Sequence, residues 1–207
     1  MASVALLDYG SSNLRSVAKA LQAAAPADTT VRISTTAAEL RSADRVVFPG
    51  QGAIGQCMQR LQALDLIAAL TDCVHNKPFL GICLGLQSLL TASEENGGTP
   101  CLNIIPGAVR RFPADAGLKV PHMGWNRVVQ RQSHPLWGNI PSGERFYFVH
   151  SYYVAPADAA ITAGSTEYGL DFASALARDN FFAVQFHPEK SQRAGLALLG
   201  NFLRWNP

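Results

Sequence analysis

The sequence predicts an α/β fold with a central, mostly parallel sheet and an added antiparallel portion in its second half. Up to about residue 93, short apolar runs alternate with helical patterns. This alternation predicts a parallel sheet covered by helices on both faces. From about residue 107, short strands separated by Pro, Gly and Asn turns replace the alternation, which is typical of antiparallel pairing. The 207 residues contain no internal repeat or low-complexity linker, so we expect a single domain over 1–207.

In the first half, each expected strand ends where a helical pattern begins. Asn13 is a candidate cap for the first helix. The third helical pattern is long, with apolar residues at near-helical spacing. We expect strands at 3–9, 30–34, 44–48 and 78–82, and helices at 13–24, 36–43, 54–75 and 84–93.

The second half is expected to form mainly short strands and one closing helix. This helix begins at about Ser191 and is expected to bury Leu196, Leu199, Phe202 and Leu203. The expected strands are 107–112, 125–130, 145–154, 161–166 and 181–186.

Composition excludes several classes of function. The net charge is +2, and the 17 Lys and Arg residues are scattered, so no nucleic-acid-binding surface is expected. No apolar run approaches the length of a membrane helix, and the N-terminus does not resemble a secretory signal. The four cysteines show no zinc-ligand spacing, so we expect free thiols, a cytoplasmic chain and neither metal nor cofactor.

Cys83 lies between Gly81 and Gly85, where an apolar strand gives way to a helical pattern. The pattern has the form of a nucleophile elbow with sulfur in place of oxygen. A sharp strand-to-helix turn crowds the nucleophile, so neighbours without a Cβ are needed on both sides. The alternative, a small core cysteine with incidental glycines, has about equal weight from this pattern alone.

His187 is the histidine best placed to act as a base for such a thiol. It follows an apolar strand, and Pro188 and Glu189 come directly after it. Glu189 can point back at the imidazole, set its tautomer and stabilise its charged form. The other four histidines lack a carboxylate in this position, and a structural role is favoured for each.

Residues 49–52, Pro-Gly-Gln-Gly, follow a third apolar strand. Gly50 and Gly52 would let main-chain N–H groups approach a substrate, so we interpret this loop as a second wall of an oxyanion site. An ordinary tight turn before a helix explains the stretch equally well.

Together, the three motifs resemble the class I (triad) glutamine amidotransferases. G-x-C-x-G-x-Q, a downstream HPE and an upstream PGxG occur in matching order and spacing along nearly the whole chain. The resemblance implies the three-layer, flavodoxin-like fold of that family. It also implies hydrolysis of glutamine through a γ-glutamyl thioester, with Cys83 as nucleophile, His187 as acid and base, and Glu189 as the orienting carboxylate.

The resemblance further implies a set of oxyanion and substrate contacts. The backbone N–H of Leu84 would be one oxyanion donor, and the PGxG loop would supply the other. Gln51 occupies a position where many relatives have an apolar residue, and it could change how readily this loop flips. A related hypothesis is that the oxyanion site assembles only when a partner enzyme holds its nucleotide. The implied contact residues are Gly50, Gln51, Gly52, Leu84, Gln87, Glu95, Ser151 and Tyr152.

Three further stretches resemble one branch of the family, the glutaminase subunits of imidazole glycerol phosphate synthases. They are LLDYGSSNLRSV at the start, PHMGWN at 121–126, and FVHSYY followed later by FHPEKS. This branch implies a (β/α)₈-barrel cyclase as partner in a heterodimer, to which ammonia passes for histidine biosynthesis. Asn13, Trp125 and Lys190 would lie at or near that interface, although Lys190 is equally well explained as an exposed cation.

Three other functions compete with this interpretation. The chain could be the glutaminase subunit of another amidotransferase, such as those of anthranilate, GMP or pyridoxal phosphate synthesis. A stand-alone cysteine hydrolase would use Cys83 and His187 but leave PHMGWN without a purpose. A non-catalytic interaction protein would not require an intact Cys83, His187 and Glu189.

Overall fold

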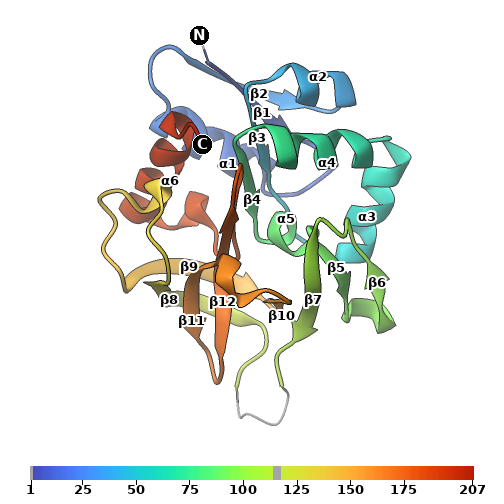
Figure 1. Ribbon diagram of the computed structural model, residues 1–207, viewed down its shortest axis with the longest axis vertical. Helices are drawn as coiled ribbons and strands as arrows, with labels where there is room; N and C mark the ends of the chain where they lie inside the picture. The colour runs from blue at the N-terminus through green and yellow to red at the C-terminus, as the bar shows by residue number, and fades with distance from the viewer. Residues whose placement is uncertain (1, 114–117) are drawn as a thin grey trace.

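A computed structural model describes residues 2–113 and 118–207, and these form a three-layer α/β structure (Figure 1). Helices lie on both faces of one large mixed sheet. The helices are α1 (Leu14–Ala24), α2 (Ala37–Ser42), α3 (Ile54–Ala63), α4 (Ile67–Asn76), α5 (Leu84–Gln87) and α6 (Gln192–Arg204). The sequence also predicts a loop at 113–117, and residues 114–117 of it lie outside the described residues.

The first part of the sheet is parallel, in the order β2-β1-β3-β4-β13. Its strands are β1 (Ala2–Leu7), β2 (Thr29–Ser34), β3 (Arg45–Phe48), β4 (Phe79–Ile82) and β13 (Phe181–Val184). The last strand of the chain therefore lies directly beside β4. Because parallel strands end at the same edge of a sheet, the loops after β3, β4 and β13 meet there.

The sheet continues beyond β13 through mainly antiparallel pairs. β5 and β7 add one parallel pair within this part. The remaining strands are β5 (Leu90–Ser93), β6 (Thr99–Pro100), β7 (Ile105–Arg111), β8 (His122–Gln130), β9 (Glu144–His150), β10 (Tyr152–Pro156), β11 (Thr162–Glu167) and β12 (Asp171–Arg178). This mixed arrangement confirms the fold class predicted from the sequence.

Two apolar clusters hold the layers together. On one face, α1 and α6 pack together against the sheet, as Figure 1 shows on the side of the blue and red helices. On the other face, α2, α3 and α4 cover the parallel strands. Alternate residues of β1 illustrate the division, since Leu6 contributes to the first cluster and Leu7 to the second. Within the described residues, no helix is both long and apolar enough to cross a membrane.

Two helices expected from the sequence are wrong in extent. The helix expected over 54–75 is broken into α3 and α4 at Asp65, whose φ of 52° cannot continue a helix. The helix expected over 84–93 stops at Gln87, and Leu90–Ser93 forms β5 instead. Pairing of β5 with β6 and β7 overrides the local helical pattern there.

Smaller differences occur elsewhere. The expected strand 145–154 is two strands, β9 and β10, separated at Ser151. Strand β12 was not predicted, because its alanines and serine weaken the strand signal. Leu196 is 40% exposed rather than buried, whereas the other three apolar residues expected in the last helix's core are buried.

Candidate active site

Cys83 occupies a sharp turn between β4 and α5, and its backbone is strained. Its φ of 54° and ψ of −103° lie outside the regions that non-glycine residues normally adopt. A Cβ on Gly85 would overlap the Phe48 carbonyl, and one on Gly81 would lie 3.1 Å from the Ala183 Cβ. A glycine is therefore required at 85, and a side chain at 81 would be tightly packed, in agreement with the sequence prediction.

His187 reaches the turn because β13 runs beside β4. Val184 pairs with Ile82, and the Cys83 N–H donates a 2.7 Å hydrogen bond to the Val184 carbonyl. Three residues later the His187 side chain is fully buried, with Nδ1 2.8 Å from Glu189 Oε1. Its Nε2 is buried and bonds to no other group in the described parts of the chain, which leaves it free for the nearby sulfur.

Charge around His187 favours the imidazolium. Burial alone lowers the pKa of His187, but the facing Cys83 sulfur and the Glu189 carboxylate outweigh it and raise the pKa to about 10. Burial also disfavours the charged form of Glu189 and by itself raises the pKa of this carboxyl group. Its hydrogen bonds to His187 and Asn13 outweigh burial, so the pKa of Glu189 is lowered overall. The triad is therefore set up as a negative carboxylate, a positive imidazole and a facing sulfur.

Asn13 has a different role from the cap expected from the sequence. It stands directly before α1, but its side chain makes no capping hydrogen bond. Instead, Nδ2 donates a 3.0 Å hydrogen bond to Glu189 Oε1. Only 5% of Asn13 is exposed, so in this chain it supports the Glu189 carboxylate rather than facing solvent.

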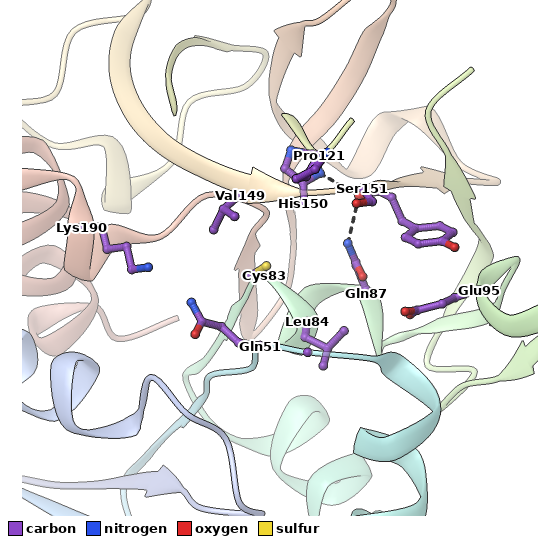
Figure 2. Close-up of a pocket in the computed structure, with 12 residues that line it drawn as sticks. Gln51, Cys83, Leu84, Gln87, Glu95, Pro121, Val149, His150, Ser151 and Lys190 are labelled. Carbon is purple, nitrogen blue, oxygen red and sulfur yellow. Dashed lines mark hydrogen bonds between the residues drawn. The ribbon is translucent and has the colours of Figure 1, made fainter. Parts of the chain in front are cut away.

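A cavity of about 390 Å³ opens above the Cys83 sulfur (Figure 2). Figure 2 shows the sulfur pointing into it, with Lys190 on one side and Glu95 on the other. Most of the predicted site residues line this cavity, whereas the fully buried side chains of His187 and Glu189 do not. The lining residues are Gln51, Gly52, Cys83, Leu84, Gln87, Glu95, Pro121, Val149, His150, Ser151, Tyr152 and Lys190.

The predicted oxyanion donor already has a partner. The Leu84 N–H points at the Gly50 carbonyl oxygen at 3.4 Å. Gly50 packs closely, since a Cβ there would lie 2.6 Å from the Tyr9 hydroxyl, and Gly52 has a φ of 101° that favours glycine. The Gln51 amide oxygen accepts a 3.1 Å hydrogen bond from the Ser12 hydroxyl. In this conformation the loop presents a carbonyl where an oxyanion would need donors.

Gln185 belongs to the site, and sequence reasoning missed it. It is fully buried; Nε2 lies 3.5 Å from the Cys83 sulfur, and Oε1 accepts a 3.1 Å hydrogen bond from Gln87 Nε2. The available signal was its place two residues before His187, because alternate residues at a strand end lie on the same face. Gln87 also donates a 3.0 Å hydrogen bond to the Tyr152 carbonyl.

Glu95 is partly committed to the fold. One carboxylate oxygen accepts a 2.9 Å hydrogen bond from the Ile54 N–H at the start of α3. This contact fixes the Glu95 side chain at the rim of the cavity, on the side away from Lys190. Its position is compatible with both anchoring α3 and contacting a ligand.

Trp125 and Lys190 lie on an exposed surface beside the cavity. Trp125 is 45% exposed, and its ring meets that of Tyr147 edge-on at 6.0 Å. Lys190 Nζ lies 5.7 Å from the centre of the same Tyr147 ring. The neighbouring Met123 is 58% exposed, so an apolar patch surrounds this end of β8.

The other cysteines lack the setting of Cys83. Cys57 and Cys73 are buried on α3 and α4, as expected for packing residues, and burial raises the pKa of both thiols. Within residues 2–113 and 118–207, no group of three His, Cys, Asp or Glu side chains is arranged to hold a metal ion.

Residues 5–205 match the family described as glutamine amidotransferase class-I. The chain belongs to the class-I glutamine amidotransferase family. It is 59% identical to a Nitrosococcus oceani protein named imidazole glycerol phosphate synthase subunit HisH, over 100% of this chain and 99% of that one. Proteins of the same name from Nitrosospira multiformis and Acinetobacter baylyi are 55% and 51% identical, with full coverage of both chains.

Solved structures of more distant proteins share the fold of this family. A putative GMP synthase protein from Thermoplasma acidophilum superposes with a TM-score of 0.69 at 21% identity, over 99% of this chain and 93% of that one. The glutaminase domain of Trypanosoma brucei CTPS gives a TM-score of 0.62 at 14% identity, over 100% and 96% of the two chains.

Proposed function

We propose that this protein is the glutaminase subunit of an imidazole glycerol phosphate synthase. It hydrolyses L-glutamine to glutamate and ammonia and passes the ammonia to a cyclase subunit. The observation that carries the proposal is the 51–59% identity, over essentially the whole chain, to proteins with that name. The sulfur lines one cavity and faces the imidazole, which in turn bonds to the carboxylate, and this arrangement supports the chemistry.

Cys83 would act as the nucleophile, His187 as the acid and base, and Glu189 as the orienting group. The thiolate attacks the side-chain carbonyl carbon of glutamine, and a C–S bond forms. The imidazolium gives its proton to the leaving nitrogen as the C–N bond breaks, which releases ammonia. His187 then takes a proton from water, and the resulting hydroxide cleaves the thioester to glutamate and regenerates the sulfur.

The oxyanion site must be completed before this chemistry runs. In the present conformation the Gly50 carbonyl accepts the Leu84 N–H, so the negative oxygen of a tetrahedral intermediate would meet another oxygen. Rotation of the Gly50–Gln51 peptide would remove that carbonyl and turn an N–H toward the site. Oxyanion donors are worth about 10²–10³ in rate, so this rotation would act as an on-switch.

The partner proposed here is a (β/α)₈-barrel cyclase. The exposed patch around Met123 and Trp125, together with Lys190, supports a docking surface beside the cavity. Exposed apolar patches rimmed by charge are typical of protein interfaces. Docking there would close the cavity mouth near Cys83, so that ammonia passes to the partner before bulk water protonates it.

The test is reconstitution with the cyclase encoded by the same organism. We expect the two chains to co-purify and glutamate release to rise at least tenfold when the cyclase holds its nucleotide. Equal rates with and without the loaded cyclase would contradict the proposed switch.

A second measurement separates the competing functions. Glutamine, a peptide and a simple ester are offered to the complex, with free ammonia as a bypass for the cyclase. A stand-alone cysteine hydrolase would cleave the peptide or ester without the partner. Failure to bind the barrel cyclase, with glutamine cleavage retained, would favour another amidotransferase.

A further inference from the structure

His122 and His150 form a buried pair on neighbouring strands, outside the triad. They face each other across the antiparallel β8–β9 pair, and His122 Nδ1 lies 2.9 Å from His150 Nε2. Both residues are at least 94% buried. His122 is also held between two rings, with centroids 4.8 Å from Phe148 and 4.0 Å from Tyr168.

The partners of this pair fix the proton on each ring. His150 Nδ1 lies 2.7 Å from the Tyr152 carbonyl, which only accepts, so Nδ1 carries the proton. His150 Nε2 is then an acceptor and takes the proton of His122 Nδ1. His122 Nε2 in turn accepts from Asn126 Nδ2 at 3.2 Å.

The orientation of Asn126 is fixed as well. Its Nδ2 donates to the Glu167 carbonyl at 2.9 Å, and its Oδ1 accepts from the Arg127 N–H at 2.7 Å. Burial lowers the pKa of His122 to about 4 and that of His150 to about 3, so both rings are neutral at pH 7. Asn126, His122 and His150 thus form a hydrogen-bond line in which each residue donates to the next, ending at the carbonyl of Tyr152 in the cavity wall.

This hydrogen-bond line connects with the active site at the Tyr152 carbonyl. The Tyr152 carbonyl accepts from both His150 Nδ1 and Gln87 Nε2, so it joins the histidine pair to the predicted substrate contact. Gln87 then reaches Gln185, and Gln185 reaches the Cys83 sulfur. Both His150 and Tyr152 line the cavity.

We propose that His122 and Asn126, through the tautomer they impose on His150, are positioning residues that hold the Tyr152 carbonyl and Gln87 for the amino-acid end of glutamine. This gives the inward side of the PHMGWN stretch a purpose, beside the outward Met123 and Trp125. The proposal rests on the proposed glutaminase function for its substrate, whereas the hydrogen-bond line stands on geometry alone. Ring packing of His122 between Phe148 and Tyr168 is the competing explanation.

An isosteric pair of variants separates positioning from packing. In His122→Asn, the amide Nδ2 stands at the bond position of Nδ1 and still donates to His150. In His122→Leu, the side chain has the same branched shape as Asn, but it has no N–H to donate, so His150 Nε2 is left without a partner. We expect His122→Leu to raise the KM for glutamine about tenfold in the cyclase complex, with kcat within threefold, and His122→Asn to restore most of the affinity. Equal KM values for the two variants would overturn the proposal in favour of packing.

Asn126→Leu provides a second variant should His122→Leu fail to fold. It removes the donor to His122 Nε2, together with the Asn126 contacts to the Glu167 carbonyl and the Arg127 N–H, while all three stacked rings remain, and we expect the KM to rise about threefold. Arg127→Gln, on the exposed side of the same strand, is the matched control and should leave the KM unchanged. An unchanged KM in Asn126→Leu would count against the proposal.

Nitrogen-15 NMR of the imidazoles in the full chain tests the line without reference to activity. We expect the Nδ1-protonated tautomer for His122 and His150 at pH 7, although free imidazole favours the other form. An Nε2–H signal from either ring overturns the proposal. Should the wild-type complex fail to cleave glutamine, the proposed function falls, and the tautomers still decide whether the hydrogen-bond line exists.

Discussion

The parallel and antiparallel parts of the sheet position their active-site groups by different means. In the parallel part, Cys83 is placed by backbone geometry: a strained turn, two crowded glycines and a neighbouring strand. In the antiparallel part, the Tyr152 carbonyl lies on a paired strand and also accepts the last of a series of side-chain hydrogen bonds that starts at Asn126 and runs through His122 and His150. Backbone placement tolerates few substitutions, whereas a hydrogen-bond line is expected to fail gradually. Four predictions test this difference, from the largest expected effect to the smallest.

The largest effect is expected at the sulfur itself. Cys83→Ser keeps the shape of the elbow but replaces the thiolate by a poorly ionised hydroxyl, so glutamine hydrolysis should fall at least about 1000-fold. Ammonia-dependent synthesis by the cyclase complex should remain near wild type and serves as the control. Residual glutamine hydrolysis above about one per cent would show that another group attacks the substrate.

A backbone substitution beside the sulfur should destabilise the whole fold. Gly85→Ala places a Cβ into the Phe48 carbonyl, so we expect a loss of about 3 kcal/mol in the free energy of unfolding. Gly55→Ala is the control, because its Cβ would meet nothing closer than 3.8 Å and the residue lies within α3. Urea unfolding should show the control unchanged or stabilised by about 0.5–1 kcal/mol. Similar stabilities for the two variants would mean that the elbow is not crowded.

The two parts should also respond oppositely to pH. Burial lowers the folded-state pKa of His122, His134 and His150 to about 4, 4 and 3, below the unfolded value near 6.5. The neutral rings therefore contribute fully to the free energy of unfolding above pH 6.5. This contribution is lost as pH falls toward 4, by up to about 1.4 kcal/mol per pH unit for each ring. His187 is raised to about 10, so its contribution is present below pH 6.5 and is lost as pH rises through 10.

Urea unfolding between pH 4.5 and 10.5 measures both limbs. His134→Asn retains an acceptor for the Leu136 N–H and should make the acid limb less steep, since the other two histidines remain, whereas His75→Gln, at an exposed position, should leave it unchanged. If the free energy of unfolding of the wild type did not change from pH 6.5 to 4.5, the lowered pKa values of these histidines would be refuted.

The smallest effect is expected at Gln185. Gln185→Leu removes the amide beside the Cys83 sulfur and the acceptor for Gln87, so kcat/KM for glutamine should fall about tenfold. Gln62→Leu, on the exposed surface of α3, is the control. An effect as large as that of Cys83→Ser would mean that hydrogen bonds, and not the backbone, set the position of the sulfur.

The fold was predictable where local pattern and tertiary structure agree. β3 and β4 are apolar runs that end in glycine turns, and the structure forms them within one residue of expectation. The prediction failed at 84–93, where Leu90–Ser93 reads as helix but pairs with β6 and β7. Strand pairing is non-local, so a single sequence does not reveal which pattern it will override.

The site was predictable to the extent that motifs mark strand ends. Cys83 and His187 each follow a predicted strand, and Glu189 lies two residues after His187. Their proximity also depends on β13 pairing in parallel with β4, whereas the sequence places strand 181–186 in the antiparallel half. Gln185 and the Asn13–Glu189 contact were not predicted. Gln185 has only its place two residues before His187 as a signal, the Asn13–Glu189 contact has none, and each depends on a partner at least 98 positions away. The state of the oxyanion loop was equally hidden, since a peptide's orientation leaves no mark in the sequence.

The pairing of β4 with β13 makes the enzyme vulnerable at a distance from its reactive atoms. Ile82 lies opposite Val184, and only this alignment brings two segments about a hundred positions apart onto one side of the sheet. A slip of a single residue between these strands would turn the imidazole to the opposite face while leaving every motif intact. Inactive variants of this protein should therefore include conservative core replacements at the β4–β13 seam, which a search restricted to the catalytic motifs would overlook.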